Sequence, residues 1–305
     1  MAPQQSNRST LTLKAYQTIT AFACLAVSSL PANEVRLAAS DLLAAVLAPP
    51  LESYAAEREL AVKLESIGSL PAMQKMAANE FDLAIIAVPT EQPLPQEGYR
   101  VYPFAYSAAF VAVNLSNPLD EISVSRLAGI FGANEELNVT TWGDLGLTGR
   151  GSRSIKALAD QNDESIALEL FKHTAFKGGK LKASVERTSR ATIESILAQN
   201  AAAIAILSRK PDDPMIKLLS VAEAEDLPAF GPSDDNVHYG DYLFRLSFYL
   251  VLPDTDTMGV ADVALELLGD PMATVLADAG LIPLPKAVRQ QLQMDLNLSR
   301  SELEK

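Results

Sequence analysis

Short apolar segments alternate with amphipathic segments along the chain from Glu34 onward. Runs rich in β-branched residues are typical of buried strands, whereas apolar residues three or four positions apart predict helices. This pattern predicts strands at 34–40, 60–66 and 81–89, with helices at 41–56 and 71–79 between them. The first helix is expected to break near Pro49 and Pro50, because proline removes a backbone donor. Such a βαβ order predicts a mostly parallel sheet.

The same alternation continues beyond residue 100. Two neighbouring strands are expected at 101–107 and 108–114, followed by a turn and a helix at 117–131. After a glycine-rich loop at 140–153, the pattern predicts strands at 154–159 and 202–207 and helices beginning near residues 161 and 192. The last expected elements are a long strand at 241–253 and helices at 260–268 and 271–279.

This order of elements predicts an α/β protein of two lobes, each with a mixed, mostly parallel sheet flanked by helices. Residues 33–110 and 245–295 are expected to form lobe 1 and residues 111–244 lobe 2, with 296–305 as a tail. Two crossover strands, near 102–114 and 243–253, would act as a hinge. A clamshell of this kind binds its ligand between the lobes.

Residues 1–32 differ from the rest of the chain. Arg8 and Lys14 precede an apolar run at 19–30, and Ala32 ends a small-residue cleavage site. This pattern is typical of a secretory signal peptide, and the run is shorter than the roughly 20 apolar residues that span a bilayer. An ordinary N-terminal helix is the alternative. Cleavage would place the protein in the periplasm or outside the cell and would remove Cys24, the sole cysteine.

Composition argues against several classes of function. The chain of 305 residues has a net charge of −13 and no basic stripe, so nucleic acid is not an expected partner. His173 and His238 are the only histidines, and no His-Glu-x-x-His or cysteine-rich spacing is present. The sequence around Ser69 is not the Gly-x-Ser-x-Gly turn of hydrolases. We therefore expect no catalytic residue, no metal and no cofactor, and a protein that is not an enzyme.

Serines at the starts of three expected helices are the candidate ligand contacts. In the stretch QNDESIALELF, residues 161–171, Ser165 precedes the apolar helix positions, and Ser40 and Ser69 occupy similar places after expected strands. The free amides of a helix N-terminus form a natural seat for an anion. Serine is also a preferred N-cap, a role that contributes about 1 kcal/mol without any ligand. Both roles stay open for each serine.

Four longer segments carry a family resemblance. They are ESIGSLPAMQKMAANEFDLAII at 65–86, NPLDEISVSRLAGIFGANEELNVTTWGDLGLTG at 117–149, HTAFKGGKLKASVE at 173–186 and GDPMATVLADAGLIPLP at 269–285. Together they resemble the phosphate-binding proteins of ABC transporters, the PstS-like branch of the type 2 periplasmic binding proteins. The resemblance implies a secreted receptor that encloses phosphate between two lobes and works with the membrane subunits of an ABC transporter. We expect such a receptor to be a monomer.

The ligand motifs of that family map onto three loops of this sequence. The ligand-binding residues that the resemblance implies are Ser40, Asp41 and Leu42 in the first loop, Ser69 and Leu70 in the second, and Gln161, Ser165, Ile166 and Ala167 in the third. Each serine is kept, but Gln161 replaces an arginine, and Leu70 and Ile166 replace glycines. Glutamine offers a neutral amide in place of a charged fork that matches oxyanions. A weakened or altered anion site is therefore expected.

Several alternatives stay open around this site. A replacement cation could come from the arginines grouped around the second lobe, which are Arg150, Arg153, Arg187 and Arg190. Asp41 could accept a proton from a protonated oxyanion or an amine. If Leu70 and Ile166 instead filled the cleft, the protein would be a sensory or protein-interaction module that binds little ligand. Trp142, in a segment that resembles a structural motif of the family, is expected to pack in a hydrophobic corner.

Overall fold

The computed structural model describes residues 34–90, 92–95, 97–133, 136–147, 152–162, 165–255 and 259–303, with side chains described as far as Leu298. The expected signal peptide and Arg150 lie outside the described residues. In the part of the chain that is described, no helix combines the length and the apolar character needed to cross a bilayer.

Among the described residues, a six-stranded sheet has the order β14-β4-β13-β3-β1-β2. Its strands are β1 (Glu34–Ala39), β2 (Ala61–Ser66), β3 (Leu83–Val88), β4 (Tyr99–Ala108), β13 (Arg245–Pro253) and β14 (Ile282–Pro283). The strands β1, β2 and β3 are parallel, whereas β13 runs antiparallel between β3 and β4. The chain thus returns to the first sheet with its C-terminal part.

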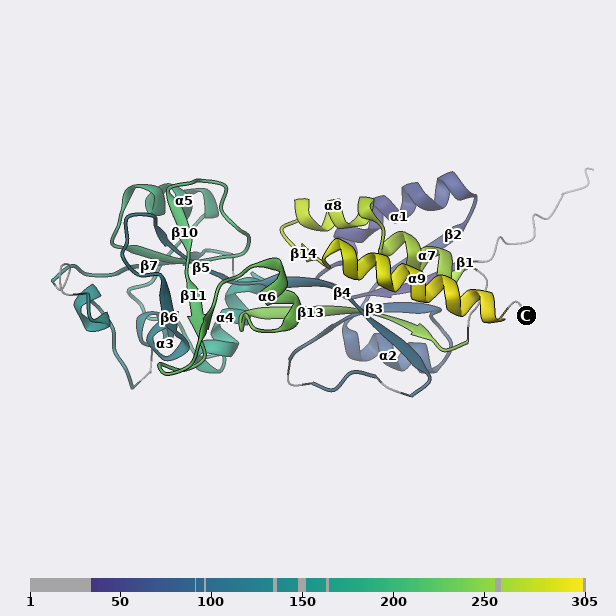
Figure 1. Cartoon of the computed structure of the whole chain (residues 1–305), viewed down its shortest axis with the longest axis horizontal. Coiled ribbons are helices and arrows are strands. Elements are labelled where there is room, and N and C mark those ends of the chain that lie inside the picture. The colour runs from purple at the N-terminus through teal and green to yellow at the C-terminus, as the bar shows by residue number, and fades with distance from the viewer. Residues whose placement is uncertain are drawn as a thin grey trace, which may run out of the picture. The chain divides into compact units, whose positions relative to one another are not determined.

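Helices cover both faces of this sheet (Figure 1). They are α1 (Ala44–Arg58), α2 (Ser69–Ala77), α7 (Val260–Leu267), α8 (Asp270–Asp278) and α9 (Lys286–Leu303). Side chains alternate between the two faces of a strand. Leu37 and Ile85 therefore belong to the core under α1, α7 and α8, while Ala38 and Ile86 pack with Met76 of α2.

A second sheet in the described chain has five strands in the order β10-β5-β9-β7-β8. They are β5 (Phe110–Asn114), β7 (Lys156–Asp160), β8 (Glu186–Thr188), β9 (Ala203–Leu207) and β10 (Ile216–Leu218). The strand β7 is parallel to both of its neighbours, β8 and β9. The helices in the part of the chain that forms this sheet are α3 (Val124–Phe131), α4 (Ile166–Phe176) and α5 (Arg190–Gln199), with a 3₁₀ turn at Trp142–Leu145.

A small third sheet adds β6 (Glu121–Ser123), β11 (Ser220–Ala222) and β12 (Ala229–Phe230), and the short helix α6 (Asp234–Tyr239) follows it. None of these elements was expected from the sequence, and neither were β8, β10, β14 and the part of α9 that precedes the tail. The unexpected strands have two or three residues, which is too short to show a period. The expected mixed α/β architecture is confirmed.

One prediction about the helices is wrong. The helix α1 does not break at Pro49 and Pro50, because both prolines lie inside a continuous helix. Proline removes a hydrogen bond and crowds the preceding turn, which disfavours this arrangement locally. Leu47, Leu51 and Tyr54 are buried along one face of the helix. We attribute the continuity of α1 to this burial on both sides of the prolines.

The two segments that connect the first sheet with the second are hydrogen-bonded to each other. Ala109 lies between β4 and β5, and its amide donates to the carbonyl of Phe244 at 2.9 Å. The hydroxyl of Tyr242 donates to the carbonyl of Ala109 at 2.7 Å, and burial raises the pKa of this tyrosine. Tyr242 and Phe244 are fully buried. The crossover is therefore a tightly packed part of the molecule.

Replacing Tyr242 with phenylalanine should lower the free energy of unfolding by about 1–3 kcal/mol, because the ring stays while the buried hydrogen bond is lost. Urea denaturation followed by circular dichroism measures the change. Tyr239→Phe is a matched control, because the Tyr239 side chain is 73% exposed and its change should stay within about 0.5 kcal/mol. Equal stability of the two variants would show that the hydroxyl of Tyr242 contributes nothing at the crossover.

Candidate functional site

Ser40 directly follows β1 and is 2% exposed. Its amide donates to the carbonyl of Ile85 at 2.8 Å, which fixes the end of β1 beside β3. Its hydroxyl oxygen accepts a hydrogen bond from the amide of Leu42 and donates to Asp41, both at 3.4 Å. Ser40 is not the N-cap of α1, since Leu43 occupies that position without a side-chain cap. The carbonyl of Ser40 nevertheless accepts hydrogen bonds from the amides of Leu43 and Ala44, so Ser40 caps the turn that leads into α1.

Ser69 is the first residue of α2, and Gly68 occupies the N-cap position. The hydroxyl oxygen of Ser69 accepts a hydrogen bond from the amide of Ala87 in β3 at 2.9 Å. This long-range bond joins the start of α2 to the sheet and replaces the capping role that serine often has. The next residue, Leu70, is 71% exposed. Its side chain thus does not fill a cleft in this structure.

Ser165 is the N-cap of α4, and its hydroxyl oxygen accepts a hydrogen bond from the amide of Leu168 at 3.5 Å. Ser165 therefore has a capping role in this structure. Ile166 is half-buried and Ala167 is buried, whereas Gln161 is exposed. The backbone amide of Gln161 donates to the carbonyl of Thr188 at 3.0 Å, and this hydrogen bond extends the pairing of β7 with β8.

The structure brings two of the three serine loops together. In the register of β1 and β2, Ala39 lies opposite Ser66, and Ser40 and Ser69 follow these two strand ends. In open α/β sheets, ligands bind at the carboxyl ends of parallel strands. Ser165 lies beyond the carboxyl end of β7 in the second sheet. Joining its loop to the first two is part of the proposal below.

The arginines grouped around the second sheet differ in their surroundings. Arg187 donates through Nε and Nη2 to the carbonyl of Asp160, at 3.1 and 3.0 Å. Arg190 forms an ion pair with Glu194 at 2.7 Å, and its Nη1 is buried without a hydrogen-bond partner among the described residues. Arg153 is exposed in the loop before β7. Of these arginines, Arg187 is thus the one that is hydrogen-bonded to the end of β7. Its acceptor, Asp160, directly precedes Gln161.

The two histidines lie on different elements. His238 is in α6, where its Nδ1 is 2.9 Å from the hydroxyl of Tyr106. Burial, with help from the nearby Arg245, lowers the pKa of His238, and burial raises the pKa of Tyr106 to about 12. His173 is exposed on α4. Within the described ranges, no group of three or more histidine, cysteine or acidic side chains is placed to hold a metal ion.

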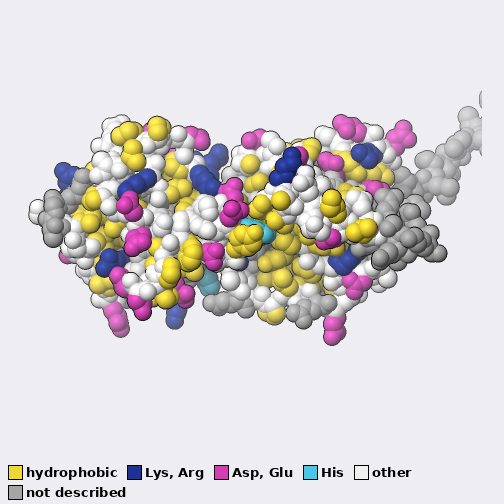
Figure 2. Space-filling model, in the orientation of Figure 1, with side chains coloured by type: hydrophobic (Ala, Val, Ile, Leu, Met, Phe, Trp, Pro, Cys, Tyr) yellow, Lys and Arg dark blue, Asp and Glu magenta, His cyan; other side chains and the backbone are white. Residues whose placement is uncertain are grey.

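Charges of both signs are mixed over the surface. On the face in Figure 2, basic and acidic side chains are interspersed, and apolar side chains surround a histidine near the middle. No continuous basic stripe is visible on this face. The phosphate backbone of a nucleic acid is bound by clustered Lys and Arg side chains. This face therefore offers no surface suited to nucleic acid.

Comparison with known proteins identifies the family. A family model described as the PBP superfamily domain matches residues 25–243, which is more than half of the chain. The chain belongs to the PBP superfamily. It is also 25% identical over 213 residues to the phosphate-binding protein PstS of Pseudomonas aeruginosa, and the match covers 66% of each chain. The chain thus spans about two thirds of the length of this relative.

Solved structures show the same fold. A possible phosphate-binding protein from Planctomyces limnophilus superposes with a TM-score of 0.68 at 14% identity, covering 88% of this chain and 99% of the other. An ABC-type phosphate transport receptor from Vibrio cholerae gives a TM-score of 0.63 at 16% identity, covering 83% and 100%. The expected two-lobed type 2 fold and the PstS-like resemblance are confirmed. The names of these relatives are those of phosphate-binding proteins and not of enzymes.

Proposed function

We propose that this protein is an extracytoplasmic substrate-binding receptor for phosphate or a related small oxyanion. The ligand would lie between lobe 1 (33–110 and 245–295) and lobe 2 (111–244), against the loops that begin at Ser40, Ser69 and Ser165. Residues 1–32 would direct export to the periplasm or the outside of the cell. The protein would act as a monomer and deliver its ligand to the membrane subunits of an ABC transporter. The phosphate-binding relatives described above support this proposal.

The proposal rests on the hydrogen bonds that the serine hydroxyls form. A hydroxyl can accept two hydrogen bonds and donate one. The hydroxyls of Ser69 and Ser165 each accept a backbone N–H, from Ala87 and Leu168, which orients the oxygen and leaves its own proton available. Two oriented O–H donors beside free helix amides form a neutral donor set for an anion. The hydroxyl of Ser40 would join this set by giving up its hydrogen bond to the carboxylate of Asp41, which is long at 3.4 Å.

The binding mechanism would be lobe closure. A ligand that contacts both lobes only in the closed form stabilises that form by its differential affinity. The buried crossover at Ala109, Tyr242 and Phe244 would be the hinge, since it joins the two sheets. The third loop has the neutral Gln161 where the family motif has an arginine, and no other permanent charge replaces that arginine in this proposal. The affinity for phosphate should therefore be weaker than it would be with an arginine at position 161.

Ser69→Ala and Ser165→Ala should each raise the dissociation constant for inorganic phosphate about tenfold, because each removes one hydrogen bond to a charged ligand. Isothermal titration calorimetry measures the change. Ser53→Ala is the matched control, since this serine is exposed on α1 and its hydroxyl donates to the carbonyl of Pro49 in the same helix. This variant should bind phosphate as the wild type does.

Absence of heat with phosphate, sulfate and small carboxylates would overturn the receptor proposal. It would favour the alternative of a sensory or protein-interaction module on the same fold. One observation agrees with that alternative, because Leu70 and Leu42 are 71% and 38% exposed and present apolar surface at the two neighbouring loops. In that case the exposed surface, and not a filled cleft, would bind the partner.

A further inference from the structure

Both sheets present the carboxyl ends of parallel strands beside the crossover. In the first sheet, β13 is antiparallel to β3 and to β4, so β4 runs parallel to β3 and β1. The carboxyl ends of β1 and β4, which precede Ser40 and Ala109, therefore lie at one edge of that sheet. In the second sheet, Leu207 at the end of β9 pairs with Phe110, and the parallel strand β7 ends before Gln161 at the same edge. Ligands of open α/β sheets bind at such edges.

Arg209 lies at this edge, two residues beyond the end of β9. Its side chain runs along the turn between α8 and β14, which belong to the first sheet's part of the molecule. A Cβ atom placed on Gly280 in this turn would lie 3.2 Å from the Cβ and 3.5 Å from the Nε of Arg209. Gly280 has a φ of 83°, a conformation that favours glycine, and the missing side chain leaves room for the arginine. Arg209 thus lies where the two parts of the molecule meet.

The guanidinium of Arg209 is available to a ligand. The side chain is exposed, and within the part of the chain that the structure describes it forms no hydrogen bond or ion pair. The nearby cations differ in this respect. Lys210 pairs with Asp234 at 2.7 Å, and Arg190 pairs with Glu194 at 2.7 Å. An anion would have to displace a carboxylate from either of them, but not from Arg209.

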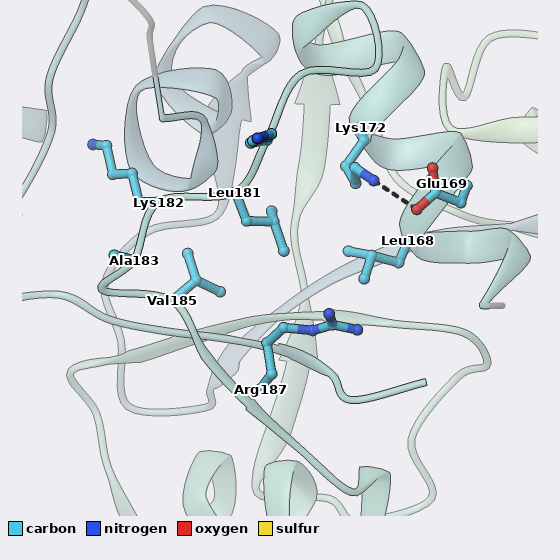
Figure 3. A pocket seen from close by; sticks show the side chains of 9 residues that line it. Leu168, Glu169, Lys172, Leu181, Lys182, Ala183, Val185 and Arg187 are labelled. Carbon is cyan, nitrogen blue, oxygen red and sulfur yellow. Dashed lines mark hydrogen bonds and ion pairs between the residues drawn. The ribbon is translucent and has the colours of Figure 1, made fainter. Parts of the chain in front are cut away.

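The cations beside α4 are engaged as well, as Figure 3 shows for the pocket that they line. Lys172 pairs with Glu169 at 2.6 Å, which is the contact drawn as a dashed line. Arg187 donates through Nε and Nη2 to the carbonyl of Asp160. Lys182 points away from this pocket and donates to a backbone carbonyl of another segment. These three side chains are therefore held by groups of the protein itself.

A guanidinium at the position of Arg209 suits the proposed anion site. It is planar and permanently charged, and its paired donors match the oxygens of phosphate and similar anions. The strand β9, which leads to Arg209, is the direct neighbour of β7, which leads to the neutral Gln161. Neighbouring strands lie about 4.8 Å apart, a distance that a long arginine side chain can span. A local positive charge also counts for more in a chain of net charge −13, whose overall field repels anions.

We propose that Arg209 supplies the permanent positive charge of the anion site formed by the serine loops, and that this site therefore takes an ionised oxyanion. The inference rests on the receptor function proposed above and adds one charged donor to its neutral serine hydroxyls. Arg209 approaches the anion from the strand beside the third loop. It offsets part of the affinity that is lost because Gln161 stands where the family motif has an arginine.

Isothermal titration calorimetry with inorganic phosphate tests this role. Arg209→Gln should raise the dissociation constant about tenfold to a hundredfold, because it removes a charge-assisted hydrogen bond. Arg209→Lys should give an intermediate value, since it keeps the charge but loses the planar fork. Lys177→Asn is the control for net charge. Lys177 is exposed at the opposite end of α4 from Ser165, and its left-handed backbone, with φ of 54°, suits asparagine, so this variant should bind as the wild type does.

NMR of the arginine Nε–H groups gives a second readout, in which the signal of Arg209 is assigned by its loss in Arg209→Gln. This signal should shift when phosphate is added to the wild type. If the wild type binds phosphate but this signal does not move, or if Arg209→Gln binds equally well, the role of Arg209 is overturned while the receptor function stands. Absence of heat when the wild type is titrated with phosphate and sulfate would overturn both.

The same variants separate ligand binding from a structural role. A cation is also favourable near the C-terminus of a helix, and Arg209 lies close to that end of α8. If Arg209 binds the anion, Arg209→Gln should keep the urea midpoint of the wild type while phosphate affinity falls. A lower urea midpoint with unchanged phosphate affinity would assign Arg209 to the end of α8 and overturn the proposal.

Discussion

Phe171→Ala should lower the free energy of unfolding by about 3–5 kcal/mol, the loss typical of truncating a buried aromatic side chain. Phe171 is fully buried in α4. Its ring packs edge-to-face against Phe131, Phe176 and Phe244, with centroid distances of 5.2, 5.8 and 5.3 Å. Edge-to-face pairs add stability beyond the area they bury. Removing the ring therefore disrupts the contacts of α4 with α3 and with the crossover at once.

Urea denaturation measures this loss, with circular dichroism as the signal. Because Trp142 is the sole tryptophan of the chain, its fluorescence gives a second signal from a different part of the same sheet's core. Phe171→Leu is the matched variant, since it keeps much of the apolar volume and should lose less stability than Phe171→Ala. A loss below about 1 kcal/mol for Phe171→Ala would contradict the role of this residue as the anchor of α4.

Trp142→Ala should produce a loss of similar size, about 3–5 kcal/mol. Trp142 is fully buried, and its indole nitrogen donates to the carbonyl of Ala202 at 3.2 Å. Its backbone amide also donates to the carbonyl of Arg153. The side chain thus holds the 3₁₀ turn against the start of β9, as the expected hydrophobic corner requires.

Comparison with Trp142→Phe separates packing from hydrogen bonding. Phenylalanine retains an aromatic ring but cannot donate, so this variant should lose about 1–3 kcal/mol from the unpaired carbonyl and additional stability from the smaller ring. Thermal and urea denaturation by circular dichroism suit both variants, because each lacks the only tryptophan. If Trp142→Ala were as stable as Trp142→Phe, the ring would contribute no packing energy at this corner.

Local patterns were sufficient for the regular elements. The helices α3, α5, α7 and α8 and the strands β1, β3, β5 and β9 lie within a few residues of their expected positions. The helices carry apolar residues at helical spacing, and the strands are short apolar runs that are buried almost throughout. The N-cap role of Ser165 is equally local, since its hydroxyl bonds to an amide three residues ahead. The continuity of α1 through Pro49 and Pro50 was not predictable locally, because it depends on burial against other elements.

The sequence by itself determined the α/β class, the succession of strands and helices, and the family resemblance, because these follow from periodicity and from residues close together in the chain. Only the tertiary structure decided that the hydroxyl of Ser69 accepts a bond from Ala87, and that the ring of Phe171 in α4 packs against Phe131 in α3. Both arrangements join residues on separate elements, and their positions depend on strand pairing and helix packing, which no local pattern encodes.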